Sequence, residues 1–222
     1  KKILILGGGY SKERSISLRS AKAIIKTISK IYKIKFCDPR QELFKTIESF
    51  KPDVIFNALH GRFGEDGYIQ SIIETLNIRY THSGVISSMS AMDKEISKKI
   101  FIKNKILTPN YIKLKNNTNN INYKKIEKYL NYPVVIKPLN EGSSLDVYIC
   151  NNKLSLATKL KKMKNYREIL IEKFIPGREI QVAIMGNKKL GAIELKPKRK
   201  FYDYQAKYNF NAKTKHIIPV NL

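Results

Sequence analysis

The stretch KILILGGGYSKERSISL, residues 2–18, joins an apolar run to three glycines and then to an amphipathic segment. The run KILIL predicts a buried strand, and the glycines predict a tight turn directly after it. Between Ile16 and Ile28 the apolar residues recur at helical spacing, so we expect a helix there. A strand, a glycine turn and a helix in this order are typical of a parallel α/β sheet.

The same alternation continues to about residue 85. Residues 54–58 (VIFNA) predict a second strand, and residues 60–67 (HGRFGEDG) predict a polar, glycine-rich loop. The next apolar residues fall on one face of a helix, namely Ile69, Ile72, Ile73 and Leu76. We therefore expect the first part of the chain to form a parallel α/β layer.

The pattern changes in the second half of the chain. Helical spacing covers residues 87–104, and a basic helix is expected near residues 154–164. Strands are expected at 134–137, 147–150, 168–172, 178–185 and 190–195. The last two flank Gly186–Lys189, which is a predicted hairpin turn. This pattern predicts an antiparallel α+β region, with a domain boundary near residues 85–95.

The net charge of +25 does not by itself predict nucleic-acid binding. Only 8 of the 43 basic residues are Arg, which makes bidentate phosphate contacts, and the lysines are spread along the chain. No apolar stretch approaches the roughly 20 residues of a membrane-spanning helix. Cys37 and Cys150 form no CxxC or Cys/His cluster, which favours reduced thiols over a metal site. We therefore expect neither a nucleic-acid nor a membrane partner.

Lys137 stands at the end of the apolar run 134–136, just before Pro138 and the loop Glu141–Ser144. A lysine at the end of a buried strand must be paired or solvated, because an isolated buried ammonium is costly. A substrate phosphate would satisfy it, and a Gly-Ser-Ser loop offers N–H groups and hydroxyls to phosphate oxygens. The stretch is not the Walker signature GxxxxGK[ST], so an ordinary P-loop is excluded.

Several polar motifs keep a structural alternative beside the functional one. GGGYSKER lacks the third glycine of GxGxxG because Lys12 stands there, although its helix start remains a general anion site. Glu13 in a first helical turn is also favoured by the helix dipole alone. Glu65 and Asp66 fit a solvated turn as well as a metal site. The aromatic segment 201–208 (FYDYQAKY) fits a lid over a site or a buried connection.

Six segments, taken in order, resemble the D-alanine–D-alanine ligases of the ATP-grasp superfamily. They are GGGYSKERSISL (7–18), ALHGRFGEDGYIQ (58–70), SGVISSMSAMDK (83–94), PVVIKPLNEGSS (133–144), ILIEKFIPGREIQVAIMG (169–186) and FYDYQAKY (201–208). The resemblance implies a mixed fold, α/β plus α+β, with a Rossmann-like domain over residues 1–90. An ATP-grasp domain would follow, with one subdomain over 91–175 and the start of a second over 176–222, incomplete at the C-terminus.

The resemblance also implies an activity. The family joins two D-alanines to D-alanyl-D-alanine through an acyl phosphate, with ATP as co-substrate and Mg²⁺ or Mn²⁺ as cofactor, for peptidoglycan precursors. It implies a cytoplasmic enzyme that is a homodimer at full length. Two alternatives stay open: a related D-alanine–D-lactate or D-serine ligase, and a non-catalytic nucleotide-binding ATP-grasp module. The tyrosine at position 208 favours D-alanine over D-lactate.

The family's site residues carry over to particular positions of this chain. ATP would be held at its phosphates by Lys94 and Lys137, at adenine by Glu172, Lys173 and Ile175, and at ribose by Glu179. The amine of the first D-alanine would be held by Glu13, with His60 nearby. Ser143 would connect Glu13 to Tyr208 and so close the lid, and Lys207 of the same lid would reach toward the γ-phosphate.

Three positions depart from the family pattern, and one part of it is missing. Asp146 and His82 stand where Gly is usual, and Gln205 stands where Glu is usual. We expect the Asp146 carboxylate to repel phosphate and to tolerate positive φ less readily than Gly. The family's metal-binding Asp, Glu and Asn and a catalytic Arg are expected beyond Leu222. On that basis we expect no turnover from residues 1–222 alone.

Overall fold

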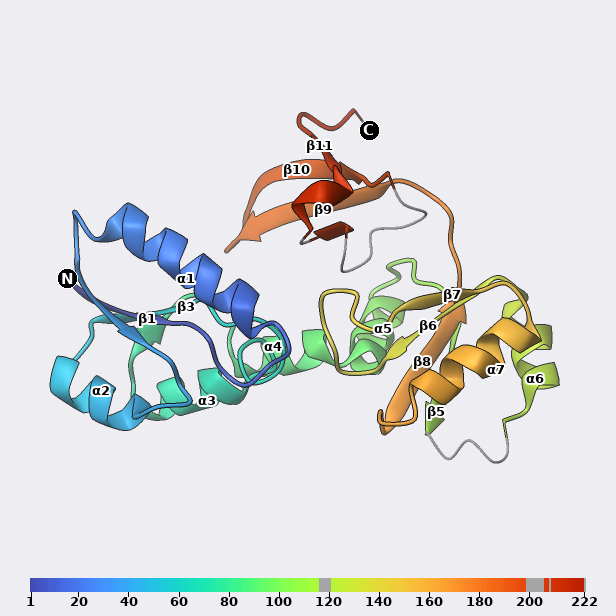
Figure 1. Cartoon of the computed structure of the whole chain (residues 1–222), viewed down its shortest axis with the longest axis horizontal. Coiled ribbons are helices and arrows are strands. Elements are labelled where there is room, and N and C mark those ends of the chain that lie inside the picture. Colours follow the sequence, from blue (N-terminus) through green and yellow to red (C-terminus); the bar gives the residue numbers. More distant parts are fainter. Residues whose placement is uncertain (116–120, 199–205, 208, 222) are drawn as a thin grey trace. The chain divides into compact units, whose positions relative to one another are not determined.

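The computed structural model describes residues 1–115, 121–198, 206–207 and 209–221 of the chain (Figure 1). It divides into two compact units, Lys1–Lys105 and Ile106–Leu222, and each is described by itself. The first of these compact units ends at Lys105. The three-part division into 1–90, 91–175 and 176–222 stays a prediction.

The first unit is a parallel sheet with helices on both faces (Figure 1). Its strands lie in the order β2-β1-β3-β4 and cover β1 Lys2–Leu6, β2 Lys33–Cys37, β3 Val54–Asn57 and β4 Arg79–Tyr80. Its helices are α1 Arg14–Ile28, α2 Leu43–Phe50, α3 Tyr68–Thr75, α4 Val85–Met92 and α5 Lys94–Lys103. The predicted α/β layer is therefore confirmed.

The apolar run at β1 explains how this sheet is covered. Leu4, Ile5 and Leu6 are fully buried, as a central parallel strand with two covered faces requires. Leu4 and Leu6 pack with residues of α2 and α3, whereas Ile5 packs with residues of α1. The alternation of side chains along the strand thus assigns one face to α1 and the other to α2 and α3.

Residues 87–104 do not form the single helix that their spacing suggests. Asp93 interrupts it with an extended backbone, and its side chain accepts hydrogen bonds from the N–H groups of Glu95 and Ile96, both at 2.9 Å. An aspartate that accepts these bonds is an N-cap, so a new helix begins at Lys94.

The second unit contains a four-stranded antiparallel sheet in the order β5-β8-β6-β7. Its elements are β5 Tyr111–Lys115, α6 Tyr123–Leu130, β6 Val134–Pro138, β7 Tyr148–Cys150, α7 Lys153–Lys162 and β8 Glu168–Lys173. Alternate residues of β6 and β8, among them Val134, Ile136 and Ile171, form one core with α6 and α7. Both helices therefore cover the same face, and Lys137 belongs to the residues of β6 that point to the other face.

A separate three-stranded antiparallel sheet follows in the order β11-β10-β9. Its strands are β9 Glu179–Met185, β10 Lys188–Lys196 and β11 Lys215–Ile217, with a 3-10 helix at Phe210–Ala212. The turn between β9 and β10 contains Gly186 at φ 58°, which confirms the predicted hairpin.

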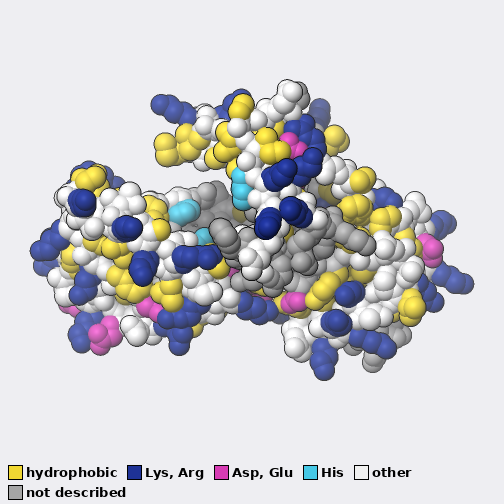
Figure 2. Space-filling model, turned by 45° about the horizontal axis from the view of Figure 1, so that its top comes forward, with side chains coloured by type: hydrophobic (Ala, Val, Ile, Leu, Met, Phe, Trp, Pro, Cys, Tyr) yellow, Lys and Arg dark blue, Asp and Glu magenta, His cyan; other side chains and the backbone are white. Residues whose placement is uncertain are grey.

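The high positive charge is distributed over the surface. Figure 2 shows Lys and Arg side chains scattered over the visible face and not gathered on one element. Within the described ranges, no helix is long and apolar enough to cross a membrane.

Candidate active site

The carboxyl ends of β1, β2 and β3 bring three loops together at one edge of the first unit's sheet. The loop after β1 turns through Gly8 and Gly9, whose φ values of 91° and 74° lie in the region that favours glycine. Asp38, after β2, holds this turn because its Oδ1 accepts hydrogen bonds from the N–H groups of Gly9 (3.0 Å) and Arg40 (3.2 Å). Its Oδ2 lies 2.6 Å from the Arg14 guanidinium. Crevices at such an edge are where α/β proteins bind ligands.

Asp38 keeps its negative charge in spite of being buried. Burial alone would raise the pKa of this carboxyl. The N–H groups of Gly9 and Arg40 and the Arg14 guanidinium outweigh burial and hold the pKa below its usual value. Sequence reasoning missed this residue, because a lone Asp between a strand and a proline carries no distinctive pattern.

Glu13 and His60 lie at the same edge. Glu13 is only 2% exposed and directly precedes α1, and its N–H donates to the Ser11 hydroxyl at 3.1 Å. That hydroxyl donates in turn to the carbonyl of His60 at 2.6 Å, and His60 Nε2 lies 3.1 Å from the Ser20 hydroxyl. Ser11 therefore ties the loop of Glu13 to the loop of His60, although their roles stay predictions.

The Glu13 carboxylate is packed against the backbone of the HGRFGEDG loop. A Cβ atom placed on Gly61 would lie 2.8 Å from Glu13 Oε2, and Gly61 has φ 70°. The N–H of Gly61 donates to Glu65 Oε2 at 2.6 Å, and the N–H of Tyr68 donates to Asp66 Oδ1 at 3.3 Å. The acidic pair thus serves the backbone of its own loop, which is the structural alternative that the sequence left open.

An amide network that the sequence did not reveal shapes the same loop. The side chains of Asn57 and Gln70 both donate to the carbonyl of Gly64, at 2.8 and 2.9 Å. A Cβ on Gly64 would lie 2.4 Å from the Cβ of Leu59, so only glycine fits there without a shift. The three glycines of this segment are therefore explained by close packing and by backbone conformation.

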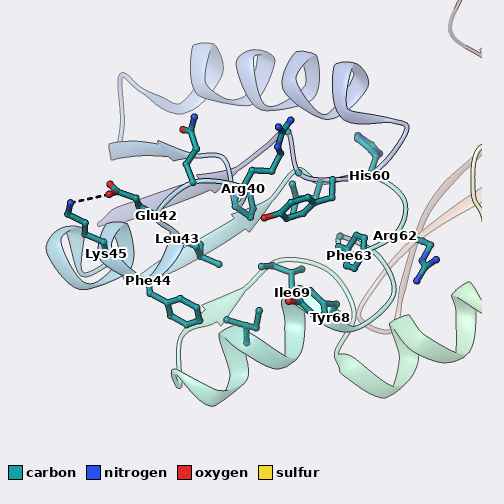
Figure 3. Close-up of a pocket in the computed structure, with 18 residues that line it drawn as sticks. Arg40, Glu42, Leu43, Phe44, Lys45, His60, Arg62, Phe63, Tyr68 and Ile69 are labelled. Atoms are coloured by element: carbon teal, nitrogen blue, oxygen red, sulfur yellow. Dashed lines mark hydrogen bonds and ion pairs between the residues drawn. The ribbon is translucent and has the colours of Figure 1, made fainter.

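A cavity of about 410 Å³ opens beside these loops (Figure 3). The rings of Tyr10, Phe63 and Tyr68 form two edge-to-face contacts along it, with centroids 5.8 and 5.3 Å apart. His60 and Arg40 add polar groups to a lining that is otherwise mainly apolar. The cavity lies wholly within the first unit, and His60 is the predicted site residue that lines it, whereas Glu13 does not.

Lys137 and Glu172 form an ion pair in the second unit. They project from the neighbouring strands β6 and β8 on the face opposite α6 and α7, and both are mostly buried. The sequence required this lysine to be either paired or solvated, and in this structure Glu172 is its partner. The strand register that joins them could not be read from the sequence.

The loop between β6 and β7 has an unusual backbone. Ser143, Ser144 and Asp146 have φ values of 49°, 57° and 51°, and the N–H of Leu145 donates to the carbonyl of Gly142 at 3.0 Å. The Asp146 carboxylate accepts hydrogen bonds from the hydroxyls of two tyrosines. The loop lies on the same hairpin as Lys137.

The other predicted site residues are placed individually. Lys94 is the first residue of α5 in the first unit and is partly buried. Lys173 Nζ donates to the carbonyl of Asn131 at 3.3 Å, Ile175 is 61% exposed, and Glu179 begins β9 at the surface. Lys207 is partly buried, while Gln205 and Tyr208 lie outside the described residues. The predicted link from Glu13 through Ser143 to Tyr208 therefore stays a prediction.

Comparison with known proteins bears on the family and the fold of this chain. The family profile described as "D-ala D-ala ligase C-terminus" matches residues 100–222, and "D-ala D-ala ligase N-terminus" matches residues 35–83. A D-alanine–D-alanine ligase from Pelagibacter ubique is 67% identical over all of this chain and 73% of its own length. The crystal structure of a D-alanine–D-alanine ligase from Bacillus anthracis matches with a TM-score of 0.84 and 35% identity. The match covers all of this chain and 72% of the other.

A second structure of the Bacillus anthracis ligase, complexed with ATP, matches with a TM-score of 0.81 and 30% identity over all of this chain and 71% of its own. Fold and comparisons together define the class: a Rossmann-like α/β domain followed by an ATP-grasp fold, as predicted. Within that class, the chain belongs to the D-alanine–D-alanine ligase family. It spans about 73% of the length of the Pelagibacter ubique relative.

Proposed function

We propose that the protein joins two D-alanines to D-alanyl-D-alanine at the expense of ATP, as a step of cell-wall precursor synthesis. A relative named D-alanine–D-alanine ligase is 67% identical to this chain, and a related ligase structure is complexed with ATP. The observation that carries the proposal is the buried carboxylate of Glu13 at the carboxyl edge of the parallel sheet. A carboxylate at the ligand-binding edge of a parallel α/β sheet can hold the ammonium of an amino acid through charge-assisted hydrogen bonds.

In the proposed reaction the carboxylate of the first D-alanine attacks the γ-phosphorus of ATP and ADP leaves. The amine of the second D-alanine then attacks the acyl phosphate carbonyl, and phosphate leaves. Glu13 would hold the ammonium of the first D-alanine, with His60 beside it. Transfer of a phosphoryl group depends mainly on positioning and charge neutralisation, so cations at the phosphates are the groups that the reaction needs.

Lys137 is the cation that the second unit offers for this purpose. In the structure its ammonium is neutralised by Glu172 on β8. An ATP phosphate would approach a lysine that is already oriented, next to the N–H groups and hydroxyls of Gly142–Ser144. Lys94, at the start of α5, would supply a second cation from the first unit. The lid residues Lys207 and Tyr208 would exclude water and so protect the acyl phosphate from hydrolysis.

Mg²⁺, a cytoplasmic location and a homodimer belong to the same proposal. In the described ranges, no three His, Cys, Asp or Glu side chains gather in a way that could hold a metal ion. We therefore assign no step to a metal and no ligand to it among these residues.

The test is D-alanine-dependent release of ADP from ATP by the intact protein, measured in a coupled assay. We expect Glu13→Gln to lower kcat/KM about 100-fold or more, because the ammonium loses its charged partner in a buried site. Glu48→Gln, on the exposed side of α2, is the matched control and should leave the rate unchanged.

The phosphate subsite is tested by Lys137→Met, which should raise KM for ATP about tenfold or more. Lys161→Met, at the exposed end of α7, is its control. The double variant Lys137→Met/Glu172→Gln removes both members of the ion pair and so separates the loss of the pair from the loss of the cation. D-serine and D-lactate as second substrates separate the related ligases. If the protein binds ATP but releases no ADP with any of these substrates, it is a nucleotide-binding module and not a ligase.

A further inference from the structure

The loop between β6 and β7 contains Asp146, one of the residues at which this sequence departs from the family pattern. Its backbone φ of 51° lies in the left-handed region, as do those of Ser143 and Ser144. Residues other than glycine avoid this region because Cβ approaches the neighbouring carbonyl oxygen, although Asp and Asn tolerate it better than most. A loop with three such residues keeps its shape only if surrounding contacts hold it.

The Asp146 carboxylate provides contacts of this kind. Its Oδ1 accepts a hydrogen bond from the Tyr148 hydroxyl at 2.9 Å, and its Oδ2 accepts one from the Tyr166 hydroxyl. Hydrogen bonds to a charged acceptor are about twice as strong as those between neutral groups. One side chain therefore ties the loop to two separate points of the same unit.

Both tyrosines are anchored in the core of the second unit. Tyr148 lies on β7 and Tyr166 precedes β8, and the rings of both pack against the buried cluster beneath α6 and α7. Lys159 of α7 lies over the Tyr148 ring, with Nζ 4.6 Å from its centroid. Burial and the bond to Asp146 raise the pKa of Tyr148 to about 12, so its hydroxyl stays a donor at physiological pH.

The anchored residue is close in sequence to the group that the ligase needs. Leu145 directly precedes Asp146, and its N–H closes a turn onto the carbonyl of Gly142. Ser143 lies inside that turn, so a movement at Asp146 changes the direction in which Ser143 and the N–H groups point.

We propose that Asp146 is a positioning residue, which through Tyr148 and Tyr166 fixes the Gly142–Leu145 turn in the shape that presents Ser143 and its N–H groups to substrate. The identity of that substrate rests on the function proposed above. The position of the turn does not. Replacement by Gly, the residue usual in the family, is therefore expected to loosen this loop and not to repair it.

The variants separate the backbone conformation from the hydrogen bonds. Asp146→Gly keeps the positive φ and removes both acceptors, whereas Asp146→Asn keeps one acceptor and turns the other atom into a donor. Tyr166→Phe removes one donor and leaves the carboxylate. Tyr129→Phe is the matched control, because this tyrosine of α6 is 55% exposed and its hydroxyl has no hydrogen-bond partner among the described residues.

Amide hydrogen exchange of residues 139–147 in the intact protein is the first readout. We expect Asp146→Gly to speed exchange of the turn about tenfold or more, the factor for losing a hydrogen bond to a charged group. Asp146→Asn should be intermediate, and the protection of β6 and β8 should not change. Tyr166→Phe should speed exchange in the wild-type background and add little to Asp146→Gly, because both remove the same bond.

Ligation kinetics are the second readout. Asp146→Gly is expected to lower kcat/KM about tenfold, mainly through KM, while the midpoint of thermal unfolding moves little. Exchange of the turn at the wild-type rate in both Asp146 variants would overturn the proposal, as would activity of Asp146→Gly at or above that of the wild type. A wild-type protein that ligates no D-alanine would refute the proposed function instead, and the exchange measurement would still decide the role of Asp146.

Discussion

Replacing Gly61 by alanine tests whether the position of the Glu13 carboxylate is set by the loop that it touches. Gly61 has φ 70°, and an added Cβ would lie 2.8 Å from Glu13 Oε2 and 3.3 Å from the Cβ of Ser11. Ordinary van der Waals contact begins at 3.4 Å, so the carboxylate must retreat by at least 0.6 Å or the loop must move. Since Glu13 is 2% exposed, it has little room to do so.

Two separate effects of this substitution can be estimated. Alanine in the left-handed region costs about 1–2 kcal/mol of stability. A misplacement approaching 1 Å of a group that orients substrate lowers the rate by up to about 100-fold. We therefore expect Gly61→Ala to lower kcat/KM for D-alanine between about 10- and 100-fold. KM for ATP should change little, because Glu13 is proposed to hold the amino acid.

The assay is ADP release at varied D-alanine and then at varied ATP, with thermal unfolding measured in parallel. Gly177→Ala is the matched control, because no atom of the described residues lies within 4 Å of its added Cβ and its φ is not in the left-handed region. If Gly61→Ala keeps the wild-type KM and kcat for D-alanine, the proposed role of Glu13 is wrong. An equal rise of both KM values would mean that the loop acts on the whole site and not on Glu13.

Three further predictions concern the single residues Asp38, Cys150 and His82. Asp38→Ala should destabilise the first unit by about 2–4 kcal/mol. Asp38→Asn should destabilise it less, because the Asn side chain can still accept hydrogen bonds from the N–H groups of Gly9 and Arg40. Hydrogen exchange of the buried β1 amides measures the loss of stability in both variants. The pKa of Asp38 in the folded protein lies below its unfolded value of about 3.9. Its contribution to the free energy of unfolding is therefore fully present above that pH and is lost as the pH falls through the folded pKa. Asp38→Asn should make the stability of the first unit less dependent on acid pH. Cys150 is fully buried with a pKa raised by burial to about 11, so it should react with a disulfide reagent at pH 8 only after unfolding. His82→Gly should leave thermal stability unchanged or raise it by up to about 1 kcal/mol, since relief of φ 81° slightly exceeds the entropic cost of Gly.

The elements that the sequence predicted are those whose residue types follow a simple pattern. The β1 run has two covered faces and so is continuously apolar, whereas the β9–β10 hairpin was predicted from alternating residue types around a turn at Gly186, although β9 is mostly exposed. The strand β2 and the helix α2 escaped prediction because each buries few residues and so has a weak apolar pattern. The residues of β2 are mostly exposed, and α2 buries only Leu43 and Ile47.

For the candidate site, the sequence suggested individual residues but could not suggest their contacts. Lys137 was identified because a cation at the end of an apolar strand demands an explanation. Its pairing with Glu172 depends on the register of β6 on β8, across 35 residues of sequence. Asp38 similarly reaches Gly9 across 29 residues. Contacts of this kind are set by strand order, which no local pattern contains.

The two non-glycine residues at positions where the family usually has glycine show what the backbone requires and what a side chain can add. His82 and Asp146 have φ values of 81° and 51°, so the fold keeps the left-handed conformation at both positions. The exposed His82 compensates little, with its ring edge-on to Phe56 at 6.3 Å and Nδ1 3.0 Å from the Thr81 hydroxyl. Asp146 instead binds two hydroxyls that are anchored in a core. The same change to glycine should therefore have opposite consequences, harmless or mildly stabilising at His82 and loosening at Asp146.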